Sequence, residues 1–254
     1  MAWLRCGSLC GLLLSLTVAS SAQSLAAARQ RGYLRIGTSG TAAPSSWVNS
    51  RNELTGYDID WGNLIGRDLN LPTRWLKIDF RGLMPALSAG QLDLVMSAVR
   101  IRPALKGVFL FSQPYSYEAT VAITRKDDLA VKGLPDIRNR VVAVVASSFQ
   151  QDVARQVGGY RDMLSLPSSG EVFLALHVGH ADVALVGARA AVHYVATGHD
   201  DIRIVEGGTT PNPQGIVIGR DSHDLKEAID RIIAARKADG TYAALYRKHF
   251  GTDP

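Results

Sequence analysis

The chain has 254 residues, of which 46% are hydrophobic and 20% are charged. This is the composition of a globular protein, and it excludes a wholly disordered, a collagen-like and a multi-span membrane chain. The net charge is +5, from 28 basic and 23 acidic side chains, with no run of like charges. Because a nucleic-acid-binding protein usually gathers its basic residues into a patch or stripe, we expect no nucleic-acid partner.

The segment 1–22 has the pattern of a secretory signal peptide. Arg5 supplies a positive charge, an apolar run follows, and small residues end the segment at Ala22. The apolar run is shorter than the roughly 20 residues that span a bilayer, which favours a signal cleaved after Ala22 over a retained anchor. Both cysteines, Cys6 and Cys10, lie in this segment, so the mature chain has no thiol or disulfide chemistry.

Strand-like and helix-like patterns alternate along the mature chain. Apolar residues recur at helical spacing in some stretches and alternate with polar residues in others, which separates helices from strands. In chain order, the first half predicts a strand over 34–38, a helix over 57–69, a strand over 73–78, a helix over 83–89 and a strand over 92–97. The second half predicts a strand over 141–145, helices over 148–157 and 172–178, strands over 181–186 and 216–219, and helices over 224–237 and 241–250. This alternation indicates βαβ units and largely parallel sheets, in two blocks at about 24–116 and 121–210.

Five motifs follow one another in a familiar order and spacing: Gly56–Asp60, Gly82–Val95, Phe111–Tyr115, Ala175–Asp182 and Asp239–Gly251. Together they resemble family 3 of the bacterial extracellular solute-binding proteins, the periplasmic receptors of polar amino-acid ABC importers. The resemblance covers nearly the whole mature chain.

The resemblance implies a fold and a setting. The fold is α/β, of the periplasmic-binding-protein type II, with two α/β lobes joined by two crossing strands and a ligand cleft between them. The first lobe would comprise 24–116 and 216–254, and the second 119–213. A monomer in the periplasm, a small-molecule ligand and the membrane permease of an ABC importer are the expected state and partners.

The residues that bind an amino acid in this family are altered here. The family binds the ligand α-carboxylate with an arginine, at a position where this chain has Leu105. The acid that binds the α-amino group falls at Gly187, and the aromatic ring that stacks on the ligand falls at Ala42. A buried ammonium without a carboxylate partner costs several kcal/mol, so we expect an ordinary α-amino acid to be a poor ligand.

Arginines stand instead near the expected cleft. Arg100 replaces a small hydroxyl residue, Arg102 follows it, and Arg81 lies beside Phe80. They favour a small anion, such as a carboxylate or dicarboxylate without a free amine, although Arg100 can also pair with Asp93 or Glu118 at the surface. Ser148 can cap a helix whose free N–H groups favour an anion. The candidate ligand-binding residues are Trp47, Phe80, Arg81, Ser97, Arg100, Arg102, Ser147, Ser148 and Phe149.

The sequence therefore predicts a solute-binding protein that captures its ligand by lobe closure, with no covalent step and no cofactor. No metal site is expected, because His177 and His180 lack a third ligand at suitable spacing. Two alternatives stay open. One is a ligand-sensing or accessory periplasmic protein of the same fold, such as one that serves a periplasmic oxidation system. The other is an enzyme like cyclohexadienyl dehydratase, which needs a cleft acid where this chain has Gly187.

Overall fold

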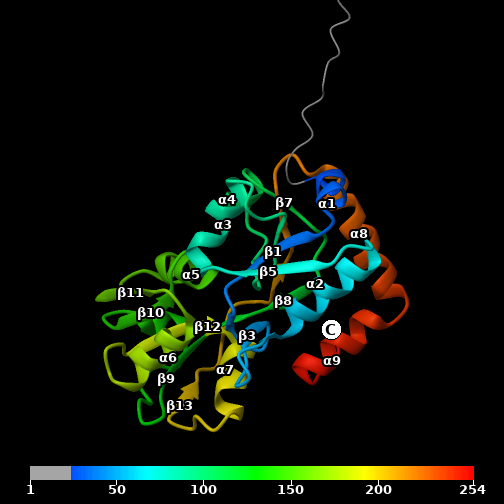
Figure 1. Cartoon of the computed structure of the whole chain (residues 1–254). Coiled ribbons are helices and arrows are strands. Elements are labelled where there is room, and N and C mark those ends of the chain that lie inside the picture. The colour runs from blue at the N-terminus through cyan, green and yellow to red at the C-terminus, as the bar shows by residue number, and fades with distance from the viewer. Residues whose placement is uncertain (1–23) are drawn as a thin grey trace, which may run out of the picture.

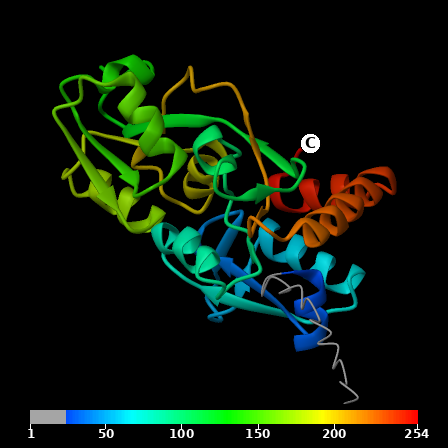
Figure 2. The ribbon, with the colours of Figure 1, turned by 90° about the horizontal axis from the view of Figure 1, so that it is seen from above.

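Two five-stranded sheets, each covered by helices, form two lobes in the computed structural model (Figure 1). The structure describes residues 24–254, so the predicted signal peptide and both cysteines lie outside the described residues. Figure 2 shows the lobes side by side, with the C-terminal helices against the first lobe.

The sheet of the first lobe has the strand order β5-β1-β6-β15-β7. Its first three strands are parallel, whereas β15 runs antiparallel to both of its neighbours. The strands are β1 (Leu34–Thr38), β5 (Thr73–Lys77), β6 (Leu94–Val95), β7 (Leu110–Phe111) and β15 (Val217–Ile218). A smaller sheet holds β2 (Thr41–Ala42), β3 (Ser46–Val48) and β4 (Leu54–Thr55). The helices of this lobe are α1 (Leu25–Arg31), α2 (Tyr57–Asp68), α3 (Phe80–Ser88), α4 (Pro103–Lys106), α8 (His223–Ala238) and α9 (Thr241–Phe250).

The sheet of the second lobe has the same mixed design, in the order β11-β10-β12-β9-β13. Here β9 is the strand that runs antiparallel to both neighbours. The strands are β9 (Thr120–Arg125), β10 (Val141–Val145), β11 (Asp162–Leu166), β12 (Val183–Gly187) and β13 (Ile202–Ile204). The helices are η1 (Leu134–Ile137), α5 (Phe149–Val157), α6 (Ser169–His177) and α7 (Ala188–Ala196).

Two antiparallel strands, β8 (Ser116–Glu118) and β14 (Asn212–Gln214), carry the chain between the lobes. Ser116 faces Gln214 and Glu118 faces Asn212 in this ladder. The backbone of Arg100 adds an isolated bridge to Gln214, so a first-lobe loop is tied directly to the crossing strands.

Each sheet buries apolar side chains on both faces, as strands covered by helices on both sides must. In the first lobe, Leu94 packs in the cluster that holds Trp61 and Ile36, whereas the next residue, Val95, packs in the cluster around Leu83. Successive side chains of a strand point to opposite faces, and the run of apolar residues here follows from that geometry.

The predicted fold class is confirmed, with two corrections of detail. The sheets are mixed rather than largely parallel, because β9 and β15 enter their sheets from the crossing segments and run against their neighbours. The stretch 207–213, which its glycines and prolines predict to be a loop, includes the first two residues of β14, which pairs with β8.

A candidate ligand-binding cleft

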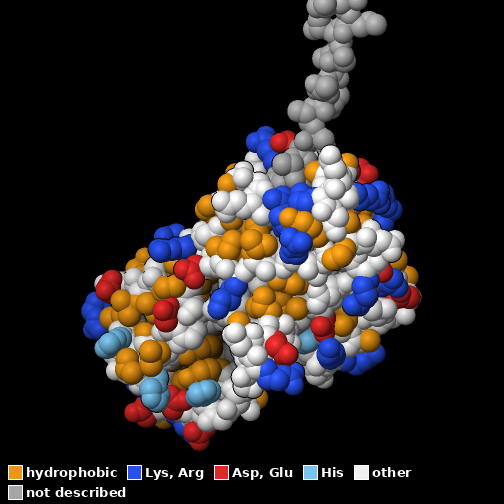
Figure 3. All heavy atoms as spheres, in the orientation of Figure 1, with side chains coloured by type: hydrophobic (Ala, Val, Ile, Leu, Met, Phe, Trp, Pro, Cys, Tyr) orange, Lys and Arg blue, Asp and Glu red, His pale blue; other side chains and the backbone are white. Residues whose placement is uncertain are grey.

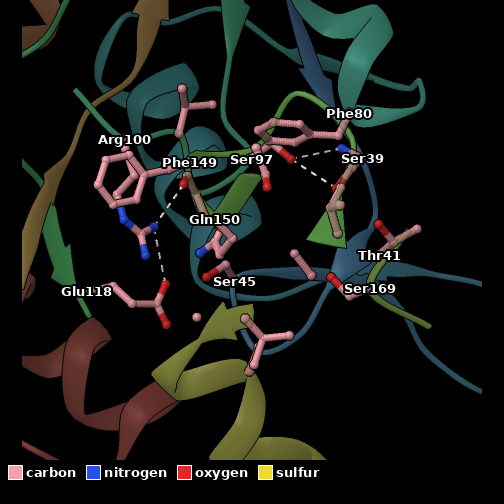
Figure 4. Close-up of a pocket in the computed structure, with 18 of the residues that line it drawn as sticks. Ser39, Thr41, Ser45, Phe80, Ser97, Arg100, Glu118, Phe149, Gln150 and Ser169 are labelled. Carbon is pink, nitrogen blue, oxygen red and sulfur yellow. Dashed lines mark hydrogen bonds and ion pairs between the residues drawn. The ribbon is translucent and has the colours of Figure 1, made fainter. Parts of the chain in front are cut away.

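The cleft lies between the lobes and takes residues from both of them. The cavity measures about 80 Å³, which is room for several water molecules or one compact solute. The first lobe contributes Ser39, Thr41, Ser45, Phe80, Ser97 and Arg100, and the second contributes Phe149, Gln150 and Ser169 (Figure 4). Gly187 of the second lobe also lines the cavity. Many of these residues follow a strand or open a helix, in keeping with the rule that open α/β sheets bind ligands beyond the carboxyl ends of their strands.

A buried carboxylate fixes the loop that carries Ser97 and Arg100. Asp58 accepts hydrogen bonds from the backbone N–H of Ala98, at 2.8 Å, and from the hydroxyl of Tyr115, at 2.6 Å. Ala98 needs this support because its φ of +52° lies in the left-handed region. Burial raises the pKa of Asp58 to about 6, against the opposing effect of the two hydrogen bonds.

Hydroxyl groups line the first-lobe side of the cavity. The hydroxyl of Ser97 lies 3.0 Å from that of Ser39 and accepts the backbone N–H of Ser39 at 3.1 Å. On the second-lobe side, Ser148 caps α5 by accepting the N–H of Gln151 at 3.2 Å. Ser148 therefore lines the cavity with a hydroxyl that already serves its own helix.

Arg100 is a buried cation in the cavity wall. Its side chain is 4% exposed, and its Nη1 lies 3.4 Å from both a carboxylate oxygen of Glu118 and the carbonyl oxygen of Ala98. The guanidinium carbon lies 5.8 Å from the ring centre of Phe149. The Nε and Nη2 groups are buried without a hydrogen-bond partner among residues 24–254. Burial lowers the pKa of Arg100, and the neighbouring carboxylate opposes that effect.

Glu118 connects Arg100 to a second arginine. Its carboxylate accepts the backbone N–H of Arg189 at 2.9 Å and the Nε2–H of Gln214 at 3.2 Å. The guanidinium of Arg189 donates to Ser116, Gln214 and the hydroxyl of Tyr246, and it lies 4.0 Å from the ring centre of Phe250. Arg189 thus joins the second lobe to the crossing strands and to α9 of the first lobe.

Two further contacts bridge the lobes at their facing surfaces. Arg102 pairs with Asp152 of α5 and donates from Nη2 to the carbonyl oxygen of Ser147 at 2.9 Å. Trp47 packs against His193 of α7, with ring centres 5.6 Å apart, and burial lowers the pKa of His193. We call the contact of Arg102 with Asp152 and Ser147 the clasp.

The candidates from the sequence divide into two groups. Phe80, Ser97, Arg100, Arg102, Ser148 and Phe149 line the cavity. Arg81 is exposed, Ser147 offers its carbonyl to Arg102, and Trp47 contacts the opposite lobe, so these three lie outside the lining.

The structure also locates the three positions at which this chain lacks the amino-acid-binding residues of the family. Leu105 packs against the apolar cluster around Leu83 and Phe111, whereas Ala42 and Gly187 line the cavity. Of the two acids expected to compete for Arg100, Glu118 is the one that contacts it, and it does so in the interior. Asp93 binds Arg35 at 2.7 Å and Arg31 instead.

Sequence reasoning did not propose Ser39, Thr41, Ser45, Gln150 or Ser169 as lining residues. Ser39 follows β1, and Ser169 and Gln150 lie in the first turns of α6 and α5. Their position at strand ends and helix starts is the signal that would have found them.

Basic and acidic side chains are interspersed on the face shown in Figure 3. Within residues 24–254, no helix combines the length and apolar character needed to cross a membrane.

Two α/β lobes around a solute-sized cleft, joined by two crossing strands, define a periplasmic binding protein of type II. The chain belongs to family 3 of the bacterial extracellular solute-binding proteins, whose family model matches residues 34–252. Among its relatives, the L-cystine-binding protein TcyJ of Escherichia coli is 26% identical over 89% of this chain and 85% of the relative. The histidine-binding periplasmic protein of Escherichia coli is 25% identical over 95% of this chain and 96% of the relative.

Solved structures agree with this assignment. A mutant of ArgBP from T. maritima superposes with a TM-score of 0.86 and 28% identity, over 90% of this chain and 99% of that one. The ancestral amino-acid-binding protein AncCDT-1, a precursor of cyclohexadienyl dehydratase, gives a TM-score of 0.84 and 27% identity, over 89% and 99%. The predicted family membership is therefore confirmed.

Proposed function

We propose that this protein captures a small carboxylate-bearing anion in the periplasm and delivers it to the membrane permease of an ABC importer. The observation that carries this proposal is the pair of unpartnered donors on Arg100. A buried donor without an acceptor costs about 1–3 kcal/mol, and more when the group is charged. The two oxygens of a ligand carboxylate suit such a guanidinium because they accept two parallel N–H bonds.

The charge balance around Arg100 supports an anion. Two largely buried guanidinium groups, those of Arg100 and Arg189, stand beside the one carboxylate of Glu118, and their side chains are 4%, 16% and 7% exposed. The Nε of Arg189 is also without a hydrogen-bond partner among the described residues. The two guanidinium groups share this one carboxylate as their ion-pair contact, and an entering anion would give Arg100 a further acceptor.

In this proposal the ligand is held by Arg100, Ser97, Phe80, Ser148 and Phe149, which line the cavity from both lobes. The moving units are 24–116 with 216–254, and 119–213, with β8 and β14 as the hinge. The ligand stabilises the closed form because it contacts both lobes only there. The protein acts as a monomer and makes no covalent bond to its ligand.

The test is a thermal-shift screen of purified protein against small carboxylates. We expect at least one of acetate, lactate, pyruvate, succinate or malate to raise the melting temperature by mass action. Arg100→Met is expected to abolish the shift, since loss of a buried charged partner weakens binding by roughly 30-fold or more. Its ligand-free melting temperature changes little, because the 3.4 Å contacts of Arg100 are long and Glu118 keeps its other donors.

Arg81→Met is the matched control. Arg81 is an exposed arginine of the same lobe that lies outside the cavity lining, so this variant should respond to the carboxylates as the parent protein does. An undiminished shift in Arg100→Met, or stabilisation by arginine and glutamine but by none of the carboxylates, would contradict the proposal.

A further inference from the structure

The carboxylate of Glu118 lies against Gly187 at the cleft, although the two residues come from different strands. Gly187 ends β12 of the second lobe, and Glu118 ends the crossing strand β8. A Cβ atom on Gly187 would lie 2.7 Å from Oε1, 2.8 Å from Cδ and 2.9 Å from Oε2 of Glu118. These distances are shorter than real Cβ contacts, so the carboxylate of Glu118 occupies the space that any side chain at 187 would need.

The backbone does not require glycine at this position. Gly187 has φ −67° and ψ 140°, an extended conformation that every residue adopts. The absence of a side chain at Gly187 leaves room for the carboxylate of Glu118.

Both carboxylate oxygens of Glu118 contact donors of the protein. Oε1 accepts the backbone N–H of Arg189 at 2.9 Å and lies 3.6 Å from its Nε. Oε2 accepts from Gln214 at 3.2 Å and lies 3.4 Å from Nη1 of Arg100. The two oxygens thus accept two hydrogen bonds and face two longer ion-pair contacts from the arginines. Glu118 is also the one acidic residue in the cavity lining, within residues 24–254.

We propose that Glu118 and Gly187 are the specificity-determining pair of the cleft, which selects carboxylates that lack an amino group. This inference rests on the proposed function and narrows its ligand class. Glu118 is a positioning residue: it holds Arg100 toward the carboxylate of the ligand. An ammonium group in the same cavity meets the guanidinium of Arg100 and must compete with the two arginines and Gln214 for the carboxylate of Glu118, so its desolvation is poorly compensated. Hydroxy acids and oxo acids avoid that cost.

The experiment compares isosteric ligand pairs by calorimetric titration: lactate with alanine, malate with aspartate, 2-hydroxyglutarate with glutamate, and phenyllactate with phenylalanine. We expect the hydroxy acid of at least one pair to bind the parent protein more than about tenfold tighter than its amino acid. Gly187→Ala should weaken that binding by about tenfold, because its methyl group displaces Glu118 and releases Arg100.

A double-mutant cycle separates positioning from a general structural effect. Glu118→Ala removes the atoms with which the new methyl group collides, so in that background Gly187→Ala should change the affinity by less than about twofold. Gly170→Ala is the glycine control, because a Cβ there has its nearest contact at an ordinary 3.9 Å.

The outcomes are distinct. If an amino acid binds as tightly as its hydroxy acid, or if the effects of Gly187→Ala and Glu118→Ala simply add, the specificity pair is wrong while carboxylate capture stands. If no carboxylate of either kind binds, the proposed function fails, and the specificity pair fails with it.

Discussion

The buried carboxyl of Asp58 should make the stability of the folded protein depend on pH. The pKa of this carboxyl is raised from 3.8 to about 6. Between about pH 4 and pH 6 the folded state therefore holds a proton that the unfolded state releases, and the free energy of unfolding falls as the pH rises through that window. Across the whole titration of Asp58 the free energy of unfolding falls by about 3 kcal/mol, and about 2 kcal/mol of this fall occurs between pH 4.5 and pH 7.5.

Asp58→Asn removes this titration and keeps the local geometry, since its amide oxygen can accept the N–H of Ala98 and its NH₂ can donate to Tyr115. We expect the stability of the variant relative to the parent to increase by about 2 kcal/mol from pH 4.5 to pH 7.5 in urea unfolding followed by tryptophan fluorescence. The corresponding melting temperatures should separate by roughly 4–8 °C.

Asp239→Asn serves as the control for that experiment. Hydrogen bonds from Thr241 and Arg236 hold the pKa of Asp239 at about 2, so its carboxyl is largely ionised in both the folded and the unfolded protein throughout the window. The reasoning about Asp58 is refuted if the difference between the parent and Asp58→Asn stays constant from pH 4.5 to pH 7.5.

The remaining predictions concern the clasp and two glycines. Arg102→Met, which removes the clasp, should increase the radius of gyration measured by small-angle scattering. Arg155→Met removes only a contact to Asp152 within α5, so its radius of gyration should stay that of the parent protein. Equal scattering curves for the two variants would exclude a role of the clasp in lobe closure. Gly56→Ala should destabilise the fold by about 3 kcal/mol or more in urea unfolding, because Gly56 has φ +126° and its Cβ would lie 2.4 Å from a backbone oxygen. Gly90→Ala, with φ +71° and open space around it, should cost only about 1 kcal/mol, and similar losses for both glycines would contradict the steric argument.

Periodicity predicted the elements that carry their own pattern. The strands at Leu34–Thr38 and Val141–Val145 and the helix at Thr241–Phe250 lie where the sequence places them. The strand β14 could not be predicted locally, because it spans three residues with a central proline and its partner β8 lies about a hundred positions earlier. The helix α7 was missed because Gly187 gives it no side-chain cap and the apolar run of β12 leads directly into it.

The residues that line the cleft could be predicted only in part, because some of their contacts depend on how the two lobes face each other. Arg100 was proposed from the resemblance to the family, in which that position faces the ligand, and Ser97 ends the strand predicted over 92–97; both line the cavity. The pairing of Arg102 with Asp152 depends on how the second lobe faces the first, which no local pattern encodes. The fit of Glu118 against Gly187 joins residues 69 positions apart through the crossing strand, and only the three-dimensional arrangement brings them together.

The clasp has a kinetic consequence. Because Arg102 joins the two lobes through protein contacts alone, the clasp stabilises the closed form before a solute binds. Entry then has to wait for spontaneous opening, so the association rate falls in proportion to the fraction of molecules that are open. The same contact delays escape, so the clasp slows both the binding and the release of a solute.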